Sequence, residues 1–226
     1  MAKRKPKTLN NLMRKESTRH PAKRILIVCE GETERLYLIG IKKKFKLGIT
    51  KEINIPDDND PSPISVVNYA IEKFNIDKKD NTNNEYDHVY CVIDRDSHSS
   101  YDKAVIKINE QNKIISGDKF KISLSDPCIE YWLLLHFTYT DKPYTCNNHK
   151  SRADYAKSDL KKYIPKYSKT DKNVIESFLN KLDVALKNAK KADMAAKKRG
   201  DTNPSTKLHE LIKKLNEDDL ESSEKI

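Results

Sequence analysis

Short apolar runs alternate with helical patterns along the first 140 residues, and this alternation constrains the fold more than any other feature of the chain. The run RILIVC at 24–29 is rich in β-branched residues and stops at Glu30-Gly31, after which apolar residues recur at helical spacing from 36 to 45. Further strands are expected at 51–55, 88–93 and 119–124, and further helices around 66–74, at 101–115 and at 127–137. Strands that alternate with helices predict an α/β fold with a mainly parallel, doubly wound sheet and right-handed crossovers.

The chain from about residue 150 onward has a helical pattern throughout, and this part contains no glycine before Gly200. One long helix is predicted over 181–199. We therefore expect a helical extension that covers or lengthens the sheet. The predicted organisation is a flexible basic arm at 1–22, an α/β domain at 23–140, a helical extension at 141–216 packed on this domain, and an acidic tail at 217–226.

Composition excludes several classes of protein. Charged residues make up 35% of the chain, and it has no run of about 18 apolar residues, so no membrane-spanning helix is expected. Cys29, Cys91 and Cys128 lie inside apolar stretches and no Cys-x-x-Cys pair occurs, which predicts buried reduced thiols rather than disulfides or a zinc site. The N-terminus is basic but lacks the apolar segment of a secretory signal. These features predict a cytoplasmic protein.

Carboxylates follow two of the predicted strands. Glu30 ends the first strand, and Asp94 and Asp96 end the third. The functional crevice of an open parallel sheet lies beyond the carboxyl ends of its strands, so these acids converge if the two strands are neighbours. Asp94 and Asp96 face the same way because positions i and i+2 of an extended segment share a side, whereas Arg95 faces away. Clustered carboxylates resist ionising together unless a cation lies among them, and oxygen ligands select Mg²⁺ or Mn²⁺.

Each of these acids also has an ordinary structural interpretation. Acids at strand ends often serve as helix N-caps or turn formers. In EGETE at 30–34, Glu34 lies one helical turn after Glu30, and Gly31 permits a tight turn close to a ligand. Glu34 is either a further acid of the site or an acid that the helix dipole favours in a first turn.

At this point the residues resemble a known module. ILIVCEGETE together with VIDRD resembles the Toprim domain, and SDPCIEYWLLLHF with NPSTKLHELIKKL (203–215) resembles the RloB family, over about residues 22–216. The resemblance implies a Toprim-like sheet with a C-terminal helical extension and a Mg²⁺- or Mn²⁺-dependent nuclease activity. It also implies a bacterial abortive-infection (AbiLii-like) or restriction setting and a companion ATPase of the RloA or SMC-like type. We recognise no strand-passage domain with a Tyr and no zinc ribbon, which favours a nuclease over a topoisomerase or primase.

The resemblance assigns roles to particular residues. Glu30 matches the Toprim glutamate, a metal ligand or general acid/base, Asp94 and Asp96 match the Asp-x-Asp metal ligands, and Glu34 matches the trailing acid. A second metal needs further oxygens, for which SDPCIE offers Ser125, Asp126 and Glu130. The expected catalytic set is Glu30, Asp94, Asp96 and Glu130, and the expected metal ligands are these four with Glu34.

The residues after Glu130 are interpreted mainly as core. Tyr131, Trp132 and the run 133–135 are more typical of core packing than of base stacking. His136 lies inside the same apolar helix, where a histidine is usually a hydrogen-bonded core residue. It is also a weak candidate for protonating a leaving oxygen.

Positive charge indicates a polyanionic partner, or else a solvated lysine surface. The net charge is +10, and residues 1–24 hold nine Lys and Arg against one Glu. The helix predicted at 181–199 places lysines on one face, opposite an apolar face, which is either a nucleic-acid-binding ridge or the wet side of a packed helix. The nucleic-acid-binding candidates are Lys150, Lys162, Lys169, Lys187, Lys190, Lys191 and Lys198.

Three functions from different classes remain open. The preferred hypothesis is a metal-dependent nuclease acting on RNA, with tRNA as one target, or on DNA. The second is a phosphatase of the haloacid dehalogenase type, although that Asp-x-Asp motif normally follows the first strand and continues with Thr or Val. The third is a catalytically silent subunit that binds nucleic acid or an ATPase partner through its acidic edge.

Overall fold

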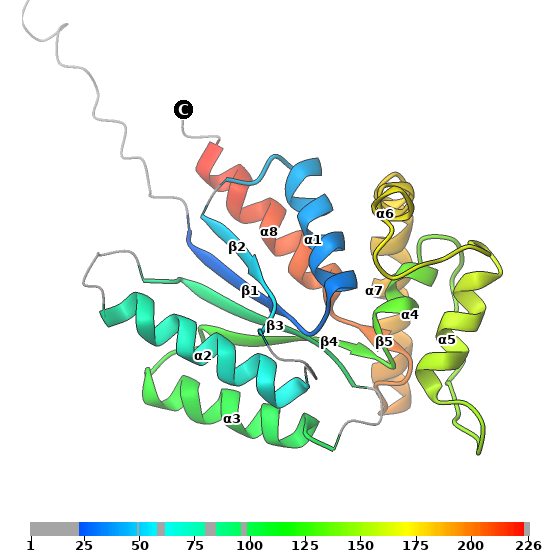
Figure 1. Cartoon of the computed structure of the whole chain (residues 1–226), viewed down its shortest axis with the longest axis horizontal. Coiled ribbons are helices and arrows are strands. Elements are labelled where there is room, and N and C mark those ends of the chain that lie inside the picture. The colour runs from blue at the N-terminus through cyan, green and yellow to red at the C-terminus, as the bar shows by residue number, and fades with distance from the viewer. Residues whose placement is uncertain (1–22, 49, 58–61, 80–84, 96–98, 224–226) are drawn as a thin grey trace, which may run out of the picture.

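The computed structural model describes residues 23–48, 50–57, 62–79, 85–95 and 99–223 (Figure 1). The basic arm expected at 1–22 lies outside these ranges, and so does Asp96. The elements in chain order are β1 (Ile25–Cys29), α1 (Glu32–Lys44), β2 (Lys51–Asn54), α2 (Pro63–Lys79), β3 (His88–Asp94), α3 (Tyr101–Ile114), β4 (Phe120–Asp126), α4 (Ile129–Leu134), α5 (Arg152–Lys161), α6 (Lys172–Leu179), α7 (Leu182–Arg199), β5 (Ser205–Thr206) and α8 (Leu208–Ser223).

The sheet is mainly parallel, as the sequence predicts. Its order is β2-β1-β3-β4-β5, with β1 to β4 parallel and β5 antiparallel to β4. The chain leaves β1 for β2 on one side and returns through α2 to β3 on the other. The direction of winding therefore changes between β1 and β3, where open α/β sheets bind their ligands.

Helices cover both faces of the sheet (Figure 1), and each face has its own core. The strands are apolar on both sides because both sides are covered. In β1, Ile25, Ile27 and Cys29 face the core beside α1, α4, α7 and α8, whereas Leu26 and Val28 face the core beside α2 and α3. Cys29, Cys91 and Cys128 are buried free thiols, as expected.

The last third of the chain corrects the expectation that it is helical throughout. Ser205 and Thr206 form β5 at the edge of β4, where the Oγ atoms of Ser125 and Thr206 lie 3.0 Å apart. Ser205 is therefore not an N-cap. The α8 helix starts at Leu208, whose N–H donates to Thr206 Oγ1 at 3.3 Å, and it continues to Ser223, so 217–223 is helical rather than a separate tail.

The α4 and α6 helices bring the extension against the sheet. The predicted helix at 127–137 shortens to α4, all six of whose residues are buried. The α6 helix packs on α1 at Gly40, where a Cβ atom would lie only 2.8 Å from Leu179 Cδ1. A larger residue at this position would push α6 away from α1.

Candidate functional site

Glu30 and Asp94 meet at the carboxyl edge of the sheet, as the sequence predicts. The strands that carry them are hydrogen-bonded neighbours, with Cys29 paired to Val92. The N–H of Glu30 donates to Val92 O at 3.0 Å, and the N–H of Asp94 donates to Glu30 Oε2 at 3.0 Å. Two acids 64 residues apart in the chain are thereby held side by side.

Glu34 and Glu130 bring two further carboxylates to this edge. Both are buried, and Glu130 stands in the first turn of α4. The N–H of Ile129, at the start of α4, donates to Asp94 Oδ2 at 3.2 Å. Gly31 leaves room for Glu34, because a Cβ atom at position 31 would lie 3.2 Å from Glu34 Oε2. We call Glu30, Glu34, Asp94 and Glu130 the acidic cluster.

Burial and the charges of neighbouring acids favour the protonated forms of Glu34 and Asp94. Burial first, and then the charges of Glu130 and Glu30, raise the pKa of Glu34 to about 7. The pKa of Asp94 lies well above its ordinary value, first because of burial and then because of the charges of Glu34, Glu30 and Glu130. The Ile129 N–H opposes this rise. A cation among these carboxylates would lower both pKa values.

The free energy of unfolding, measured with EDTA present, is expected to fall between about pH 4.5 and pH 7. The pKa of Glu34 is about 7 in the folded chain against an ordinary value of 4.5, so the folded chain keeps a proton that the unfolded chain has released. The stability that this proton contributes is fully present below the unfolded-state pKa of 4.5. It is lost as the pH rises through the folded-state pKa of about 7. Urea unfolding at several pH values measures this slope.

Glu34→Gln should flatten that slope, because a glutamine is neutral at every pH. Glu110→Gln, which changes an exposed acid of α3, should keep the wild-type slope. Equal slopes in the two variants would contradict the assignment of this titration to Glu34.

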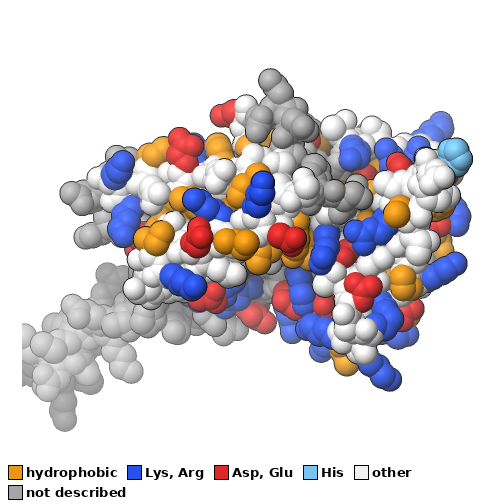
Figure 2. Space-filling model, turned by 90° about the horizontal axis from the view of Figure 1, so that it is seen from below, with side chains coloured by type: hydrophobic (Ala, Val, Ile, Leu, Met, Phe, Trp, Pro, Cys, Tyr) orange, Lys and Arg blue, Asp and Glu red, His pale blue; other side chains and the backbone are white. Residues whose placement is uncertain are grey.

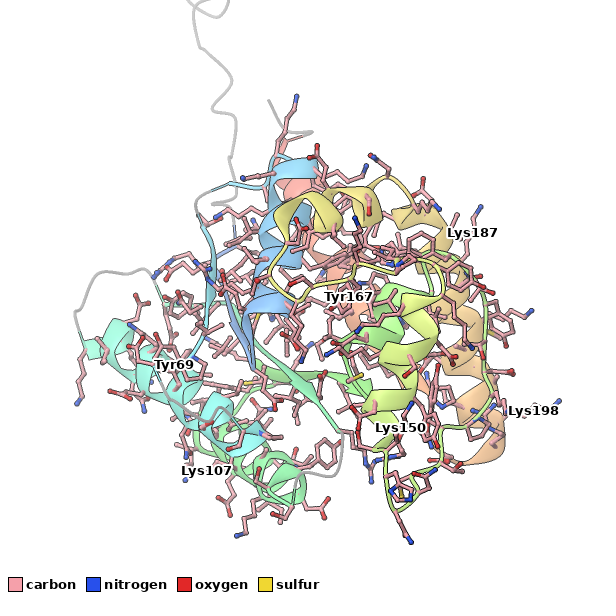
Figure 3. The ribbon with its side chains drawn as sticks, turned by 45° about the vertical axis from the view of Figure 1, so that its right-hand side comes forward. Tyr69, Lys107, Lys150, Tyr167, Lys187 and Lys198 are labelled. Carbon is pink, nitrogen blue, oxygen red and sulfur yellow. The ribbon has the colours of Figure 1, made fainter. Side chains whose placement is uncertain are left out.

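A loop between α5 and α6 closes one side of the acidic cluster. Lys169 Nζ lies 3.7 Å from Glu130 Oε1, and the Tyr167 hydroxyl donates to the same oxygen at 3.5 Å. Thr33 Oγ1 donates to the Lys169 carbonyl at 3.1 Å, which ties the loop to the start of α1. Figure 3 shows Tyr167 in this loop, between the ribbons of α1 and α5. Glu130 raises the pKa of Lys169, so this lysine carries its charge at neutral pH.

The cluster has the donor chemistry of a Mg²⁺ or Mn²⁺ site. All of its ligand atoms are carboxylate oxygens, and repulsion between them favours a cation. Asp96, the fifth predicted ligand, lies outside the described residues.

A second set of possible metal ligands lies away from the acidic cluster. Its ligand atoms lie within 4.8 Å of one another and belong to Asp193, His209 and Glu210. Lys207 Nζ lies 2.8 Å from Asp193 Oδ1 and 2.9 Å from Glu210 Oε1. An ammonium group thus fills the position that a metal ion would take.

Ser125 and Asp126, named as additional oxygens for a second metal, are engaged elsewhere. Ser125 pairs with Thr206 of β5. Asp126 is buried, with Oδ1 3.2 Å from Arg152 Nη1 and Oδ2 accepting from Thr202 Oγ1 at 2.6 Å. Arg95 Nη1 donates to the same threonine oxygen at 3.2 Å. These residues fasten the extension to the sheet edge.

His136 and its aromatic neighbours belong to the core. Tyr131 and Trp132 are fully buried, as predicted. His136 Nε2 lies 2.9 Å from the Tyr37 hydroxyl, and its Nδ1 lies 3.1 Å from the Trp132 carbonyl. Burial lowers the pKa of His136 to about 4. The structure thus favours the packing interpretation over the proton donor.

Of the seven candidate lysines, Lys169 is the one whose ammonium reaches the acidic cluster. Lys162 pairs with Asp159, and Lys150 Nζ lies 5.6 Å from the centroid of the Tyr155 ring. Lys187, Lys190, Lys191 and Lys198 are exposed on α7. Figure 3 shows Lys187 and Lys198 pointing outward from α7 and not toward the cluster.

Positive charge is not separated from negative charge on the face of the molecule seen from below. Figure 2 shows the molecule from below, and its Lys and Arg side chains are interspersed with Asp and Glu. The net charge of the chain therefore does not identify a nucleic-acid interface by itself. The sequence also contains no signal for Tyr167, which reaches the cluster only through tertiary structure, or for the bond from Thr33 to the Lys169 carbonyl.

The fold and the site define an α/β protein with a partly buried acidic cluster at the carboxyl edge of a mainly parallel sheet, where the direction of winding changes. This architecture is consistent with a Toprim-like domain. The chain belongs to the RloB-like protein family, whose model matches residues 25–215. Searches of curated proteins and of solved structures found no match to this chain. Within the described ranges, every helix is too short or too polar to cross a membrane.

Proposed function

We propose that this protein is a Mg²⁺- or Mn²⁺-dependent nuclease that hydrolyses phosphodiester bonds of RNA, with tRNA as one target, or of DNA. We propose further that it acts in the cytoplasm as the effector of an anti-phage abortive-infection system, together with an ATPase of the RloA or SMC-like type. One observation carries the nuclease proposal. Four carboxylates from β1, α1, β3 and α4 meet at the edge where such sheets bind ligands, and Lys169 is at their side.

The residues of the acidic cluster have two proposed roles, which are to bind the cation and to transfer protons. Glu30 and Asp94, with Asp96, are the proposed ligands of the cation, and Glu130 and Glu34 lie beside them. When bound, the cation would supply an activated water and neutralise charge on the attacking and leaving oxygens. A bound cation would favour the ionised form of Glu34, and an ionised carboxylate beside the cation can accept a proton.

Lys169 is the proposed electrostatic partner of the substrate. Its ammonium is more than half exposed, so it is open to a phosphate while it remains beside Glu130. Positive charge held at this position favours the transition state, where negative charge develops on the phosphate oxygens.

Purified protein incubated with total RNA, tRNA, and single-stranded and duplex DNA tests this proposal. Cutting of at least one substrate is expected with Mg²⁺ or Mn²⁺, and EDTA should stop it. Absence of cutting in every sample, also after addition of the cognate ATPase, would contradict the proposal and favour a silent binding subunit.

Lys169→Gln is expected to lower the rate constant for cutting about 100-fold. The same change should tighten binding of Mn²⁺, because it removes a positive charge beside Glu130. Single-turnover cutting and a Mn²⁺ titration followed by calorimetry measure the two effects.

Lys161→Gln is the matched control, because it removes an exposed lysine of α5. It should alter neither quantity. If Lys169 has only a structural role, Lys169→Gln would lower stability without tightening Mn²⁺ binding. That result would refute the proposed role of Lys169.

A further inference from the structure

Two hollows adjoin each other along α1. The first, of about 640 Å³, lies between α1 and α6, and the second, of about 630 Å³, lies between the end of α1 and β2. Ile39 and Lys43 line both hollows, so the two adjoin on this side of α1. Leu36, Ile175 and Leu179 give the first hollow apolar walls. We call the two hollows together the α1 groove.

One end of the α1 groove lies at the first turn of α1, the turn that also carries Glu34 of the acidic cluster. Glu32 and Arg35 line its near end and belong to the first turn of α1, directly after Gly31. These two side chains pair at 2.9 Å, so they contribute no net charge. An α-helix of 13 residues is about 20 Å long, and the groove follows α1 to its far end.

Lysines gather at the far end of the α1 groove. Lys43, Lys44 and Lys46 are exposed and line it, and no Asp or Glu occurs between positions 42 and 51. Glu52 also lines this end, but Arg24 Nη2 lies 2.9 Å from its Oε1. Glu176, an exposed acid of α6, lines the first hollow as well. The groove therefore has mixed charge and apolar walls in its first part, and a cluster of exposed ammonium groups at its far end.

We propose that the α1 groove holds a single strand of nucleic acid that runs from the acidic cluster to Lys43, Lys44 and Lys46. The proposal rests on the proposed function, since the strand is the substrate whose scissile phosphate lies at the cluster. The exposed lysines complement the phosphates, and the apolar walls suit the bases.

The size of the groove selects a single strand over a duplex. Each of its two hollows has a volume in the range of pockets that bind small ligands, about 300–1,000 Å³. One or two nucleotides fit such a hollow, whereas a double helix presents two charged backbones across grooves about 12 and 6 Å wide. Leu179 of α6 lies against Gly40 of α1, so the two helices that form the first hollow are in close contact there.

A charge-reversal experiment tests the groove. The variant Lys43→Glu/Lys44→Glu/Lys46→Glu is made in an Asp94→Asn background, so that binding is measured without cutting. Fluorescence anisotropy follows labelled single-stranded and duplex oligonucleotides of RNA and DNA over a series of salt concentrations. We expect at least about 10-fold weaker binding of the single strand, and a salt slope lower by about 2, at about 0.7 for each lost phosphate contact.

Lys103→Glu/Lys107→Glu/Lys113→Glu is the matched control, with the same change of charge on exposed positions of α3. Figure 3 shows Lys107 on α3, on the other side of the sheet from α1. This control should weaken binding less than about 3-fold through net charge alone. A loss as large as that of the groove variant would overturn the proposal.

Two further results separate the possible failures. Ile39→Asp places a negative charge where the two hollows meet, and it should weaken binding without any change in the lysines. Thermal unfolding confirms that each variant is folded. If Lys187→Glu/Lys190→Glu/Lys198→Glu weakens binding while the groove variants do not, the strand follows α7 and only the groove proposal fails. If the parent protein binds none of the oligonucleotides, the proposed function fails with it.

Discussion

Replacing Asp94 with Asn is expected to lower metal-dependent cutting at least about 100-fold while leaving the protein folded. The asparagine side-chain oxygen can still accept the hydrogen bond from the Ile129 N–H, so the local geometry is kept. The variant loses a carboxylate whose pKa is raised by burial and by three neighbouring acids, so without metal it should be at least as stable as the parent protein. Cutting rates and thermal unfolding measure the two effects.

Metal binding gives this prediction a second readout. Mg²⁺ or Mn²⁺ should raise the unfolding temperature of the parent protein, since a ligand that binds only the folded state stabilises it. Asp94→Asn should lose most of this rise, whereas Asp102→Asn, an exposed change on α3, should keep it. If Asp94→Asn retains the biological effect of the protein, the silent binding subunit becomes the better hypothesis.

Asp126→Ala is expected to cause the largest loss of stability, about 3 kcal/mol. Asp126 is buried and is shared by Arg152 and Thr202, so its removal leaves these two half-buried partners without their acceptor. For a chain of this size, 1 kcal/mol corresponds to about 2–4 °C, so the unfolding temperature should fall by about 6–12 °C. Urea and thermal unfolding measure the change.

Asp118→Ala is the comparison for Asp126→Ala. Asp118 is exposed and pairs with Lys121 at 3.6 Å, so its loss should cost less than about 0.5 kcal/mol. Similar losses in the two variants would mean that the buried contacts of Asp126 contribute no net stability.

The parallel part of the fold could be predicted because each of its strands is a short apolar run followed by a helical pattern. The β5 strand could not, because two residues carry no periodicity and Ser205 resembles an N-cap. Its pairing depends on the free edge of β4, which is visible only in the folded chain. The end of α8 was missed for a related reason, since an acidic composition does not prevent a helix whose earlier turns are packed.

The carboxylates of the site could be predicted from topology, because strand ends of a parallel sheet meet at one edge. The role of Lys169 could not be predicted, because charge alone does not distinguish it from the other six candidate lysines. Its position follows from the bond between Thr33 and the Lys169 carbonyl and from the loop that precedes α6. Likewise, the sequence predicted Asp126 as a possible metal ligand, whereas in the structure it pairs with Arg95 and Arg152, which come from separate segments.

The bond between Thr33 and Lys169 joins residues 136 positions apart, and β5 pairs with β4 across about 80 positions. Contacts of such long range form late, because the entropy of closing long loops must be overcome first. A ribosome that has made only the first 160 residues has therefore made the carboxylates without the loop that flanks them. For the nuclease that we propose, this order of assembly would delay a complete site until most of the chain has been synthesised.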